Sequence, residues 1–393
     1  MAKYRFGDIC EVLNGRAYKQ NELLSSGKYP ILRVGNFFSS DRWYYSDMEL
    51  PENKYCDYED LLFAWSASFG PKIWDGGKVI YHYHIWKLIP NDDVADKFYL
   101  YYWLRHSVNR LTAGTHGSVM AHMTKGDMEN QSIELPSLQT QKKISSILRT
   151  IDEKIHNNEA INNNLEQQAK ALFKSWFIDF EPFGGVQPPE MKFVPLQELC
   201  KVVTKGTTPT TLGKPFTSSG INFIKAESIL DSHSIDSSKF AFIDEETNAL
   251  LKRSVIKAND IVFTIAGTLG RFAMVDNSVL PANTNQAVAI IRPDENKVTP
   301  AYLYSFFIGN WHNEYYSKRI QQAVQANLSL TTIKSLPIAV LSKTTMNNYD
   351  ELVSPLFALM KGNEEENCRL SELRDTLLPK LMSGELDVSN IDL

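Results

Sequence analysis

The sequence lacks the features that would indicate a secreted, membrane-bound or disulfide-linked protein. Its four cysteines (Cys10, Cys56, Cys200 and Cys368) lie far apart without CxxC spacing, so neither a disulfide framework nor a zinc site is indicated. The first residues, MAKYRFGDICEV, lack the charged and then apolar layout of a signal peptide. No apolar run approaches the length of a membrane span. We therefore expect a cytoplasmic protein without a membrane partner.

An excess of positive charge is also missing. The formal net charge is −5 over 393 residues, so the chain has no global basic footprint of the kind that indicates a nucleic-acid binder. Any surface for nucleic acid must therefore be local or shared with a partner. At this length the chain can form two or three domains, and its content of 43% hydrophobic and 22% charged residues is that of a globular protein.

Motifs for catalysis are absent as well. There is no [ND]PP[FY] stretch of the kind that amino-methyltransferases use, and no GxGxxG follows a predicted strand. GTTPTTLGKP (206–215) resembles a phosphate-binding loop, but it has six residues between its glycines and Pro215 after the lysine. His82 and His84 could share a metal, yet without a third ligand nearby they are better explained as ordinary strand residues. We therefore expect no catalytic residue, no bound cofactor and no metal in this chain.

A long heptad pattern is present between Pro136 and Pro182. Apolar and amide side chains recur there at alternating steps of four and three residues, which predicts a helix that pairs with another helix. Ser137 is a candidate N-cap, and Pro182 with the glycines after it predicts the end of the helix. The seam consists of Ile144, Leu148, Ile151, Ile155, Asn158, Asn162, Leu165, Ala169, Leu172 and Trp176.

The same seam recurs 205 residues later, again with two central asparagines. A polar residue in a seam weakens a coiled coil but fixes its register, so two helices with this shared defect can pair within one molecule. Pro355 and Pro379 fall inside the second pattern and predict a later start or a kink, and Arg374 could instead reach outward to a partner. The seam consists of Tyr349, Val353, Leu356, Met360, Asn363, Asn367, Leu370, Arg374, Leu377 and Leu381.

The segments outside these helices repeat at a spacing of about 200 residues. In the first copy, residues 29–37, 60–67 and 78–89 predict strands and residues 96–111 predict a helix. We expect an α+β fold in which two repeated modules are separated by two long helices that pair as a coiled coil. The predicted divisions are 1–136 (first module), 137–182 (first helix), 183–192 (Gly- and Pro-rich linker), 193–341 (second module) and 342–393 (second helix and tail).

The turns of the two modules carry different side chains. The first module is rich in aromatic residues and the second in Thr, Ser, Asn and Gln, which suggests one architecture that reads two ligands. Basic, amide and hydroxyl groups, which contact the phosphates and base edges of DNA, follow equivalent turns in both modules, although each could singly be a solvated surface group. The candidate DNA-binding residues are Arg16, Lys19, Arg33, Asn36, Lys72, Lys205, Thr207, Thr208, Lys214, Lys225, Arg271, Asn285 and Gln286.

Several of these stretches resemble a known family. LPSLQTQKKISSIL and the IDEKIHNNEAINNNLEQQAKALFKSWFIDFEP that follows Thr150 resemble the central conserved region of specificity subunits of Type I restriction-modification systems. NEEENCRLSELRDTLLPKLMSGEL (363–386) resembles their distal conserved region. KGTTPTT, INFIKAESI and NTNQAV resemble one class of target recognition domain in that family.

The resemblance implies that each module is a target recognition domain that binds one half of a split, asymmetric site in double-stranded DNA. It implies that the helices pair antiparallel, for example Asn162 with Asn363, although matched seams also fit a parallel pair. Two methyltransferase subunits, which bind S-adenosylmethionine, would dock on this core, and restriction subunits that translocate DNA with ATP and Mg²⁺ can join. The alternatives are a coiled-coil scaffold that binds protein without contacting DNA, and an enzyme with its own active site, which the missing motifs disfavour.

Overall fold

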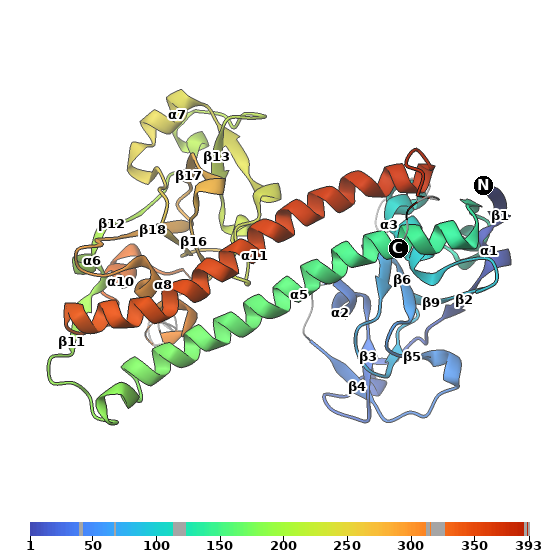
Figure 1. Ribbon diagram of the computed structural model, residues 1–393, viewed down its shortest axis with the longest axis horizontal. Coiled ribbons are helices and arrows are strands. Elements are labelled where there is room, and N and C mark those ends of the chain that lie inside the picture. Colours follow the sequence, from blue (N-terminus) through green and yellow to red (C-terminus); the bar gives the residue numbers. More distant parts are fainter. Residues whose placement is uncertain are drawn as a thin grey trace. The chain divides into compact units, whose positions relative to one another are not determined.

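The computed structural model describes residues 1–38, 42–66, 68–112, 123–311, 315, 327–388 and 391. The chain divides into two compact units, the first formed by Met1–Asn157 with Glu365–Leu393 and the second by Asn158–Glu364. Each unit contains one α+β module and parts of two long helices, α5 (Leu138–Phe177) and α11 (Lys343–Ser383) (Figure 1). The boundary between the units therefore falls inside both helices.

The first unit contains two four-stranded sheets and a two-stranded sheet that carries the chain into α5. One four-stranded sheet has the order β2 (Cys10–Asn14), β9 (Ile85–Pro90), β6 (Leu61–Ser66), β7 (Ser68–Ile73). The other has the order β4 (Tyr44–Ser46), β3 (Tyr29–Leu32), β8 (Val79–Tyr81), β5 (Tyr55–Cys56), and β1 (Ala2–Arg5) pairs with β10 (Ser132–Leu135). The helices are α1 (Phe6–Ile9), α2 (Val34–Phe38), α3 (Lys97–Thr112), α4 (Lys125–Glu129) and the 3₁₀ turns η1 (Gln20–Glu22) and η2 (Glu52–Lys54).

The second unit repeats this plan. Its main sheet has the order β12 (Cys200–Lys205), β18 (Val288–Pro293), β15 (Ile261–Thr264), β16 (Phe272–Met274), and its second sheet the order β14 (Ala241–Ile243), β13 (Ile221–Ile224), β17 (Ala282–Thr284). β11 (Lys192–Pro195) pairs with β19 (Pro337–Val340) as β1 pairs with β10. The helices are α6 (Leu196–Leu199), α7 (Glu245–Leu250), α8 (Pro300–Ile308), α10 (Leu330–Lys334) and the 3₁₀ turns η3 (Glu181–Phe183), η4 (Pro209–Leu212), η5 (Ala226–Ser228), η6 (Ser237–Lys239), η7 (Lys252–Ser254) and η8 (Asn277–Val279). The predicted α+β repeat is confirmed.

Two of the predicted strands are shorter than expected. The predicted strand 29–37 ends at Leu32, and the rest of the segment forms α2. The predicted strand 78–89 is two strands, because β8 pairs parallel with β3 in one sheet whereas β9 pairs with β2 in the other. The chain passes from one sheet to the other in the turn at residues 82–84. The sequence pattern typical of a strand continues through this turn, so it gave no sign that the strand ends there.

Within each unit the parts of α5 and α11 pack antiparallel, as predicted. In the second unit, the Nδ2 of Asn363 donates to the Oδ1 of Asn162 at 2.7 Å, and the rings of Trp176 and Tyr349 lie 5.6 Å apart. In the first unit, Lys154 lies 3.1 Å from Glu366. The amide pair therefore lies in the helix seam, where its hydrogen bond can fix the register.

The N-cap of α5 is the predicted one, and α11 begins in the same way. The Oγ of Ser137 accepts a hydrogen bond from the N–H of Thr140 at 3.2 Å, and the Oγ of Ser342 accepts one from the N–H of Thr345 at 3.2 Å. These bonds satisfy backbone donors that the first turn of each helix leaves without an intrahelical partner.

The end of α5 differs from the prediction. The helix ends at Phe177 and not near Pro182, because the N–H of Asp179 bonds to the carbonyl of Lys174 at 2.9 Å and Phe180 adopts a φ of +54°. A bond over five residues followed by a left-handed residue closes a helix. No proline is needed for this stop.

The helix α11 also departs from expectation in two respects. It begins at Lys343 and continues through Pro355 and Pro379, so it does not start later. Both prolines are exposed, which leaves the carbonyls that lose their N–H partner open to water. Arg374 does not reach outward, because its side chain is only 13% exposed and its Nη1 donates to the Oδ1 of Asp152 at 2.8 Å.

Every predicted seam residue is buried or half-buried. The seam was nevertheless incomplete near the end of α5, where Phe173 and Phe177 are the most buried side chains. Phe177 lies 4.9 Å from the ring of Tyr302 and Phe173 lies 5.9 Å from that of Phe306. Both rings also lie against Tyr349 of α11, at 6.4 and 5.0 Å, so Phe173 and Phe177 contact the module and α11 together. None of the helices in the described ranges is long and apolar enough to cross a membrane.

Candidate nucleic-acid interface

A glycine ends the first long strand of each module at a point where another turn covers it. A Cβ atom on Gly15 would lie 2.3 Å from the carbonyl oxygen of His82, and one on Gly206 would lie 1.9 Å from that of Thr284. Only glycine permits this close approach of two backbones. The glycines therefore hold the residues that follow them against the turns after β8 and β17.

Three segments meet at this point in each module. In the second module they are residues 205–208, 252–254 and 285–287, which we call the second turn cluster. In the first module they are residues 14–19, 52–54 and 82–84, which we call the first turn cluster.

The second turn cluster brings together five of the predicted residues, namely Lys205, Thr207, Thr208, Asn285 and Gln286. The N–H of Thr208 donates to the Oε1 of Gln286 at 3.2 Å, and the Thr208 hydroxyl donates to the same oxygen. The Oδ1 of Asn285 accepts a hydrogen bond from the N–H of Ala287 at 3.0 Å and shapes the turn. Gln286 is exposed. With its oxygen held by Thr208, its NH₂ group is the part that can donate to a ligand.

Arg253 also belongs to this cluster, although sequence reasoning missed it. Its Nη2 donates to the carbonyl oxygen of Lys205 and to the hydroxyl of Thr207, both at 3.4 Å. Its side chain is exposed and its partners are neutral oxygens, so its charge remains available to an anion. The second turn cluster thus combines three exposed cations, Lys205, Lys252 and Arg253, with hydroxyl and amide groups.

A buried polar network supports the cluster from below. The Oδ1 of Asn283 accepts hydrogen bonds from the Oγ of Ser254 at 2.7 Å and from the N–H of Thr284 at 2.8 Å. Its Nδ2 donates to the Oδ1 of Asn248 at 2.8 Å. Asn283 and Thr284 have no exposed surface. Because buried polar groups are costly unless paired, this network fixes η7, and with it Arg253, against β17.

The first turn cluster has the same backbone and different side chains. Tyr83, which is 37% exposed, occupies the position of Gln286, because β8 and β17 end one residue before His82 and Asn285. The ring of His82 lies 6.2 Å from that of Tyr18. Burial, with smaller effects of His84 and Arg33, lowers the pKa of His82 to about 4. The imidazole is therefore neutral at pH 7, and this cluster presents an aromatic surface.

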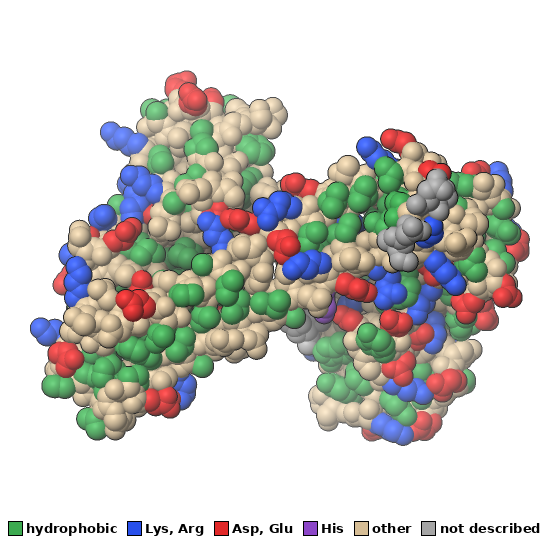
Figure 2. All heavy atoms as spheres, viewed as in Figure 1, with side chains coloured by type: hydrophobic (Ala, Val, Ile, Leu, Met, Phe, Trp, Pro, Cys, Tyr) green, Lys and Arg blue, Asp and Glu red, His purple; other side chains and the backbone are tan. Residues whose placement is uncertain are grey.

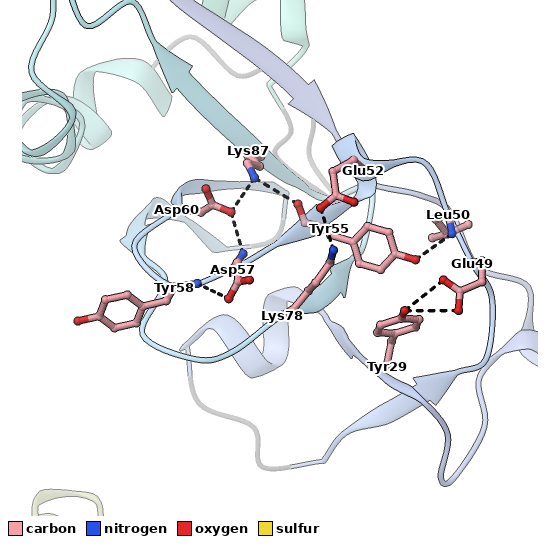
Figure 3. A network of polar contacts seen from close by, with 10 residues as sticks. All are labelled: Tyr29, Glu49, Leu50, Glu52, Tyr55, Asp57, Tyr58, Asp60, Lys78 and Lys87. Atoms are coloured by element: carbon pink, nitrogen blue, oxygen red, sulfur yellow. Dashed lines mark hydrogen bonds and ion pairs between the residues drawn. The ribbon is translucent and has the colours of Figure 1, made fainter.

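A cation has the same role in both clusters. The Nζ of Lys54 in η2 donates to the carbonyl oxygen of Asn14 at 2.7 Å, as Arg253 in η7 donates to that of Lys205. The loop that carries Lys54 is held by its neighbours: Lys78 pairs with Glu52 at 2.8 Å, and the hydroxyl of Tyr55 accepts from the N–H of Leu50 at 2.9 Å (Figure 3). The signal that could have revealed these cations is their shared position shortly before Asp60 and Asp260.

Most of the other predicted cations are paired with carboxylates of their own module. Arg16 donates to Glu22 at 2.8 Å, and this hydrogen bond raises the pKa of Arg16. The remaining pairs are Arg271 with Asp231 at 2.5 Å, Lys225 with Glu227 at 2.6 Å, Lys214 with Glu246 at 2.7 Å and Lys72 with Asp75 at 3.7 Å. Lysine and arginine side chains are correspondingly interspersed with acidic ones on the face shown in Figure 2. To contact a phosphate, each of these cations would have to leave its carboxylate.

The remaining candidates lie in the first module. Lys19 is exposed, and its backbone N–H donates to Glu22. The guanidinium of Arg33 lies 5.1 Å from the ring centroid of Tyr44. The side chain of Asn36 is used locally, because its Oδ1 accepts from the N–H of Arg33 at 3.3 Å and its Nδ2 donates to the carbonyl of Arg42 at 2.9 Å. Of these three, Lys19 is the most accessible.

The histidine pair does not form part of a larger ligand set. The rings of His82 and His84 lie 4.8 Å apart. Across the ranges that the structure describes, no group of three or more His, Cys, Asp or Glu side chains could hold a metal ion.

Comparison with known proteins gives consistent results. The chain matches the family model of the Type I restriction modification DNA specificity domain over residues 1–167 and 188–343. It is 26% identical over 321 residues to the Type I restriction enzyme MjaIX specificity subunit of Methanocaldococcus jannaschii, which covers 77% of this chain and 72% of the relative. It is 21% identical over 403 residues to the EcoBI specificity subunit of Escherichia coli, which covers 96% and 84% of the two chains.

A solved structure has the same fold. The crystal structure of the Type I restriction-modification system S subunit from M. genitalium superposes with a TM-score of 0.61 and 16% identity, over 97% of this chain and 95% of that chain. The family model covers well over half of the sequence, once over each module. The chain therefore belongs to the DNA specificity subunits of Type I restriction-modification systems, which are non-catalytic subunits of these enzymes.

Proposed function

We propose that this chain binds a bipartite, asymmetric site in double-stranded DNA, with each module reading one half through its turn cluster. The observation that carries the proposal is the repeat of one backbone arrangement with different side chains, Tyr83 in the first cluster and Gln286 in the second. Two modules that bind two different DNA sequences in the same way need the same backbone and different side chains at the positions that contact the bases.

The chemistry of the second turn cluster supports DNA as the ligand. An amide NH₂ group can donate to the acceptor atoms that base edges present in the major groove, and Gln286 is exposed with its oxygen already held by Thr208. Lys205 and Arg253, whose side chains are exposed, can contact the phosphates on either side. The remaining predicted cations would add to phosphate binding only by exchanging their carboxylate for a phosphate.

The long helices are suited to holding other subunits. In the second unit, the exposed residues Leu352 and Leu359 lie seven residues apart on α11, so they share a face that is separate from the seam toward α5. We propose that two methyltransferase subunits dock on the helices and that restriction subunits can join them. S-adenosylmethionine, ATP and Mg²⁺ would then be bound by those partners and not by this chain, which we place in the cytoplasm.

A module exchange tests the bipartite reading. Replacing residues 193–335 by the equivalent segment of a relative should change one half of the methylated sequence and leave the other intact. Methylation sequencing of DNA from cells that express the hybrid with its cognate methyltransferase measures both halves at once. A change in both halves would contradict the assignment of one half-site to each module.

A binding experiment separates this function from that of a protein-binding scaffold without DNA contact. The chain with its methyltransferase should shift a duplex that carries the methylated site, and its affinity should fall steeply with salt, as phosphate contacts require. The Arg253→Gln variant should show a shallower salt dependence than the wild type. Complex formation with the methyltransferase but without any DNA binding would favour the scaffold.

A further inference from the structure

The second unit contains a pocket of about 430 Å³ between its module and α11. The pocket lies at the start of α8, and the residues of its wall belong to the second unit. None of the residues of the second turn cluster lines it. Apolar groups from Met274, Ala301 and Phe357 form its wall, and two carboxylates, Glu295 and Asp350, lie at it.

The repeat of the fold identifies the counterpart of this pocket in the first unit. Asn259 and Glu59 occupy equivalent backbone positions, because they have φ values of +66° and +63° and each donates its N–H across to the next strand segment at 2.8 Å. Ala301 corresponds to Phe98, because each is the second residue of a helix, α8 or α3.

The long helices also line the pocket and its counterpart in the first unit. Ser354 of α11 corresponds to Arg149 of α5, since both lie twelve residues after the equivalent N-caps Ser342 and Ser137. The same spacing makes Ala358 the counterpart of Glu153. The two units can therefore be compared position by position.

In the first unit the chain's own side chains fill the place. The guanidinium of Arg149 lies 3.6 Å from the ring centroid of Phe98, and it contacts Glu153 at 3.1 Å and Glu59 at 4.0 Å. The Nζ of Lys97 lies 5.0 Å from the same ring and 3.4 Å from Glu59. The result is a guanidinium stacked on an aromatic ring between two carboxylates.

In the second unit the positions equivalent to Glu59, Lys97, Phe98, Arg149 and Glu153 carry no charged or aromatic side chain. The corresponding residues are Asn259, Pro300, Ala301, Ser354 and Ala358, which are small or uncharged, and the space is open. Other groups line the pocket instead: Phe357, which is 6% exposed and packs its ring on Tyr304, and the carboxylates of Glu295 and Asp350, of which Asp350 also accepts a hydrogen bond from Thr299 at 2.6 Å. Lys361 also lines it, so the two carboxylates leave an excess of negative charge.

We propose that this pocket receives an arginine side chain from a docked methyltransferase subunit. The inference rests on the docking proposed above and adds the place and the chemistry of one contact. A guanidinium is planar and weakly hydrated, so it stacks on aromatic rings and pairs with carboxylates at the same time. The partner's arginine takes the place that Arg149 takes in the first unit. The two docking positions are therefore unequal, because only the second requires this arginine.

A pair of reciprocal variants of the full-length chain tests the proposal. Ala301→Phe with Ser354→Arg copies the first unit into the second and fills the pocket. Phe98→Ala with Arg149→Ser is the matched control and empties the first unit's counterpart. Both are mixed with the purified methyltransferase subunit, and native mass spectrometry gives the number of bound subunits while calorimetric titration gives each affinity.

The filled variant should bind one methyltransferase subunit normally and the other roughly 30-fold or more weakly, as the loss of a buried arginine contact predicts. The control variant should bind two subunits as the wild type does. Glu295→Gln, a surface change that cannot disturb the core, should weaken one site, and the effect should shrink at high salt. This single variant keeps the test valid if the filled variant does not fold.

Two results would overturn the proposal: unchanged binding of both subunits by a folded filled variant together with unchanged binding by Glu295→Gln, or loss of both subunits from a filled variant with an unchanged melting temperature. Failure of the wild-type chain to bind any methyltransferase subunit would instead refute the docking itself. The two failures are therefore distinguishable.

Discussion

Replacing Gln286 by alanine should relax recognition at one base pair in the half-site of the second module. The side chain is exposed, and Thr208 holds its Oε1 through two hydrogen bonds, so its NH₂ group is presented in one orientation. Loss of recognition at one base pair of a specific site costs about 1–3 kcal/mol. The variant should therefore lose about 5- to 150-fold in preference at that position.

Two further substitutions set the scale of this effect. Thr208→Val keeps the volume and the backbone N–H but removes the hydroxyl that donates to Gln286, so it should lose only about 0.5–1.5 kcal/mol at the same position. Tyr83→Ala, the change at the equivalent place in the first module, should alter the other half-site only.

The assay is methylation of a randomised duplex library by the complex, followed by sequencing of the modified sites. An active Gln286→Ala complex with unchanged preference at every position would refute the assignment of this residue. Relaxation in both half-sites would show that the residue acts through the whole complex and not through a local contact.

Substitutions at three further places test the framework. Asn162→Leu alone should lower the free energy of unfolding because it leaves the amide of Asn363 without its 2.7 Å partner, whereas Leu at both positions should raise it in chemical denaturation and loosen the register. Asp260→Asn should cost about 3–5 kcal/mol in thermal melts, because this fully buried carboxylate holds Arg292 by two hydrogen bonds of 2.7 Å; an unchanged melting temperature would contradict this. Glu364→Gln should stabilise the protein at pH 8 and not at pH 4: burial, with a nearby aspartate, raises the pKa of Glu364 from 4.5 to about 7. The stability that the neutral carboxyl provides below pH 4.5 is therefore lost as the pH rises through 7, and a gain independent of pH would contradict this.

The features that the sequence predicted well depend on repeated local patterns. The seam of α5 could be predicted because a heptad is a local periodicity, and the matched asparagines, which bond as Asn162 and Asn363, indicated its partner helix, whereas the antiparallel direction came only from the family resemblance. The two-module fold could be predicted because the same strand and turn patterns occur twice. Such patterns constrain backbone form, which is why the fold was easier to predict than the contacts made on it.

The features that the sequence did not reveal depend on contacts between distant segments. Arg271 looked like an available cation, but its carboxylate, Asp231, lies 40 residues away in the chain. Phe177 lies one residue after the heptad position Trp176, and its burial comes from contacts with both Tyr302 of the module and Tyr349 of α11. Neither pairing has a local signal, since a side chain's partner depends on the tertiary fold.

Comparison of the two modules recovers part of this missing information. Lys54 and Arg253 are different residues with no shared motif. Each nevertheless donates to the backbone carbonyl of the residue just before the turn glycine, Gly15 in the first module and Gly206 in the second. A position that carries a cation in both modules, lysine in one and arginine in the other, is a better candidate for a general phosphate contact than a cation that is paired with a carboxylate. A side chain that changes character at a kept position, as Gln286 does relative to Tyr83, is a better candidate for reading sequence. The internal repeat thus separates the two roles within one chain, because each module serves as the control for the other.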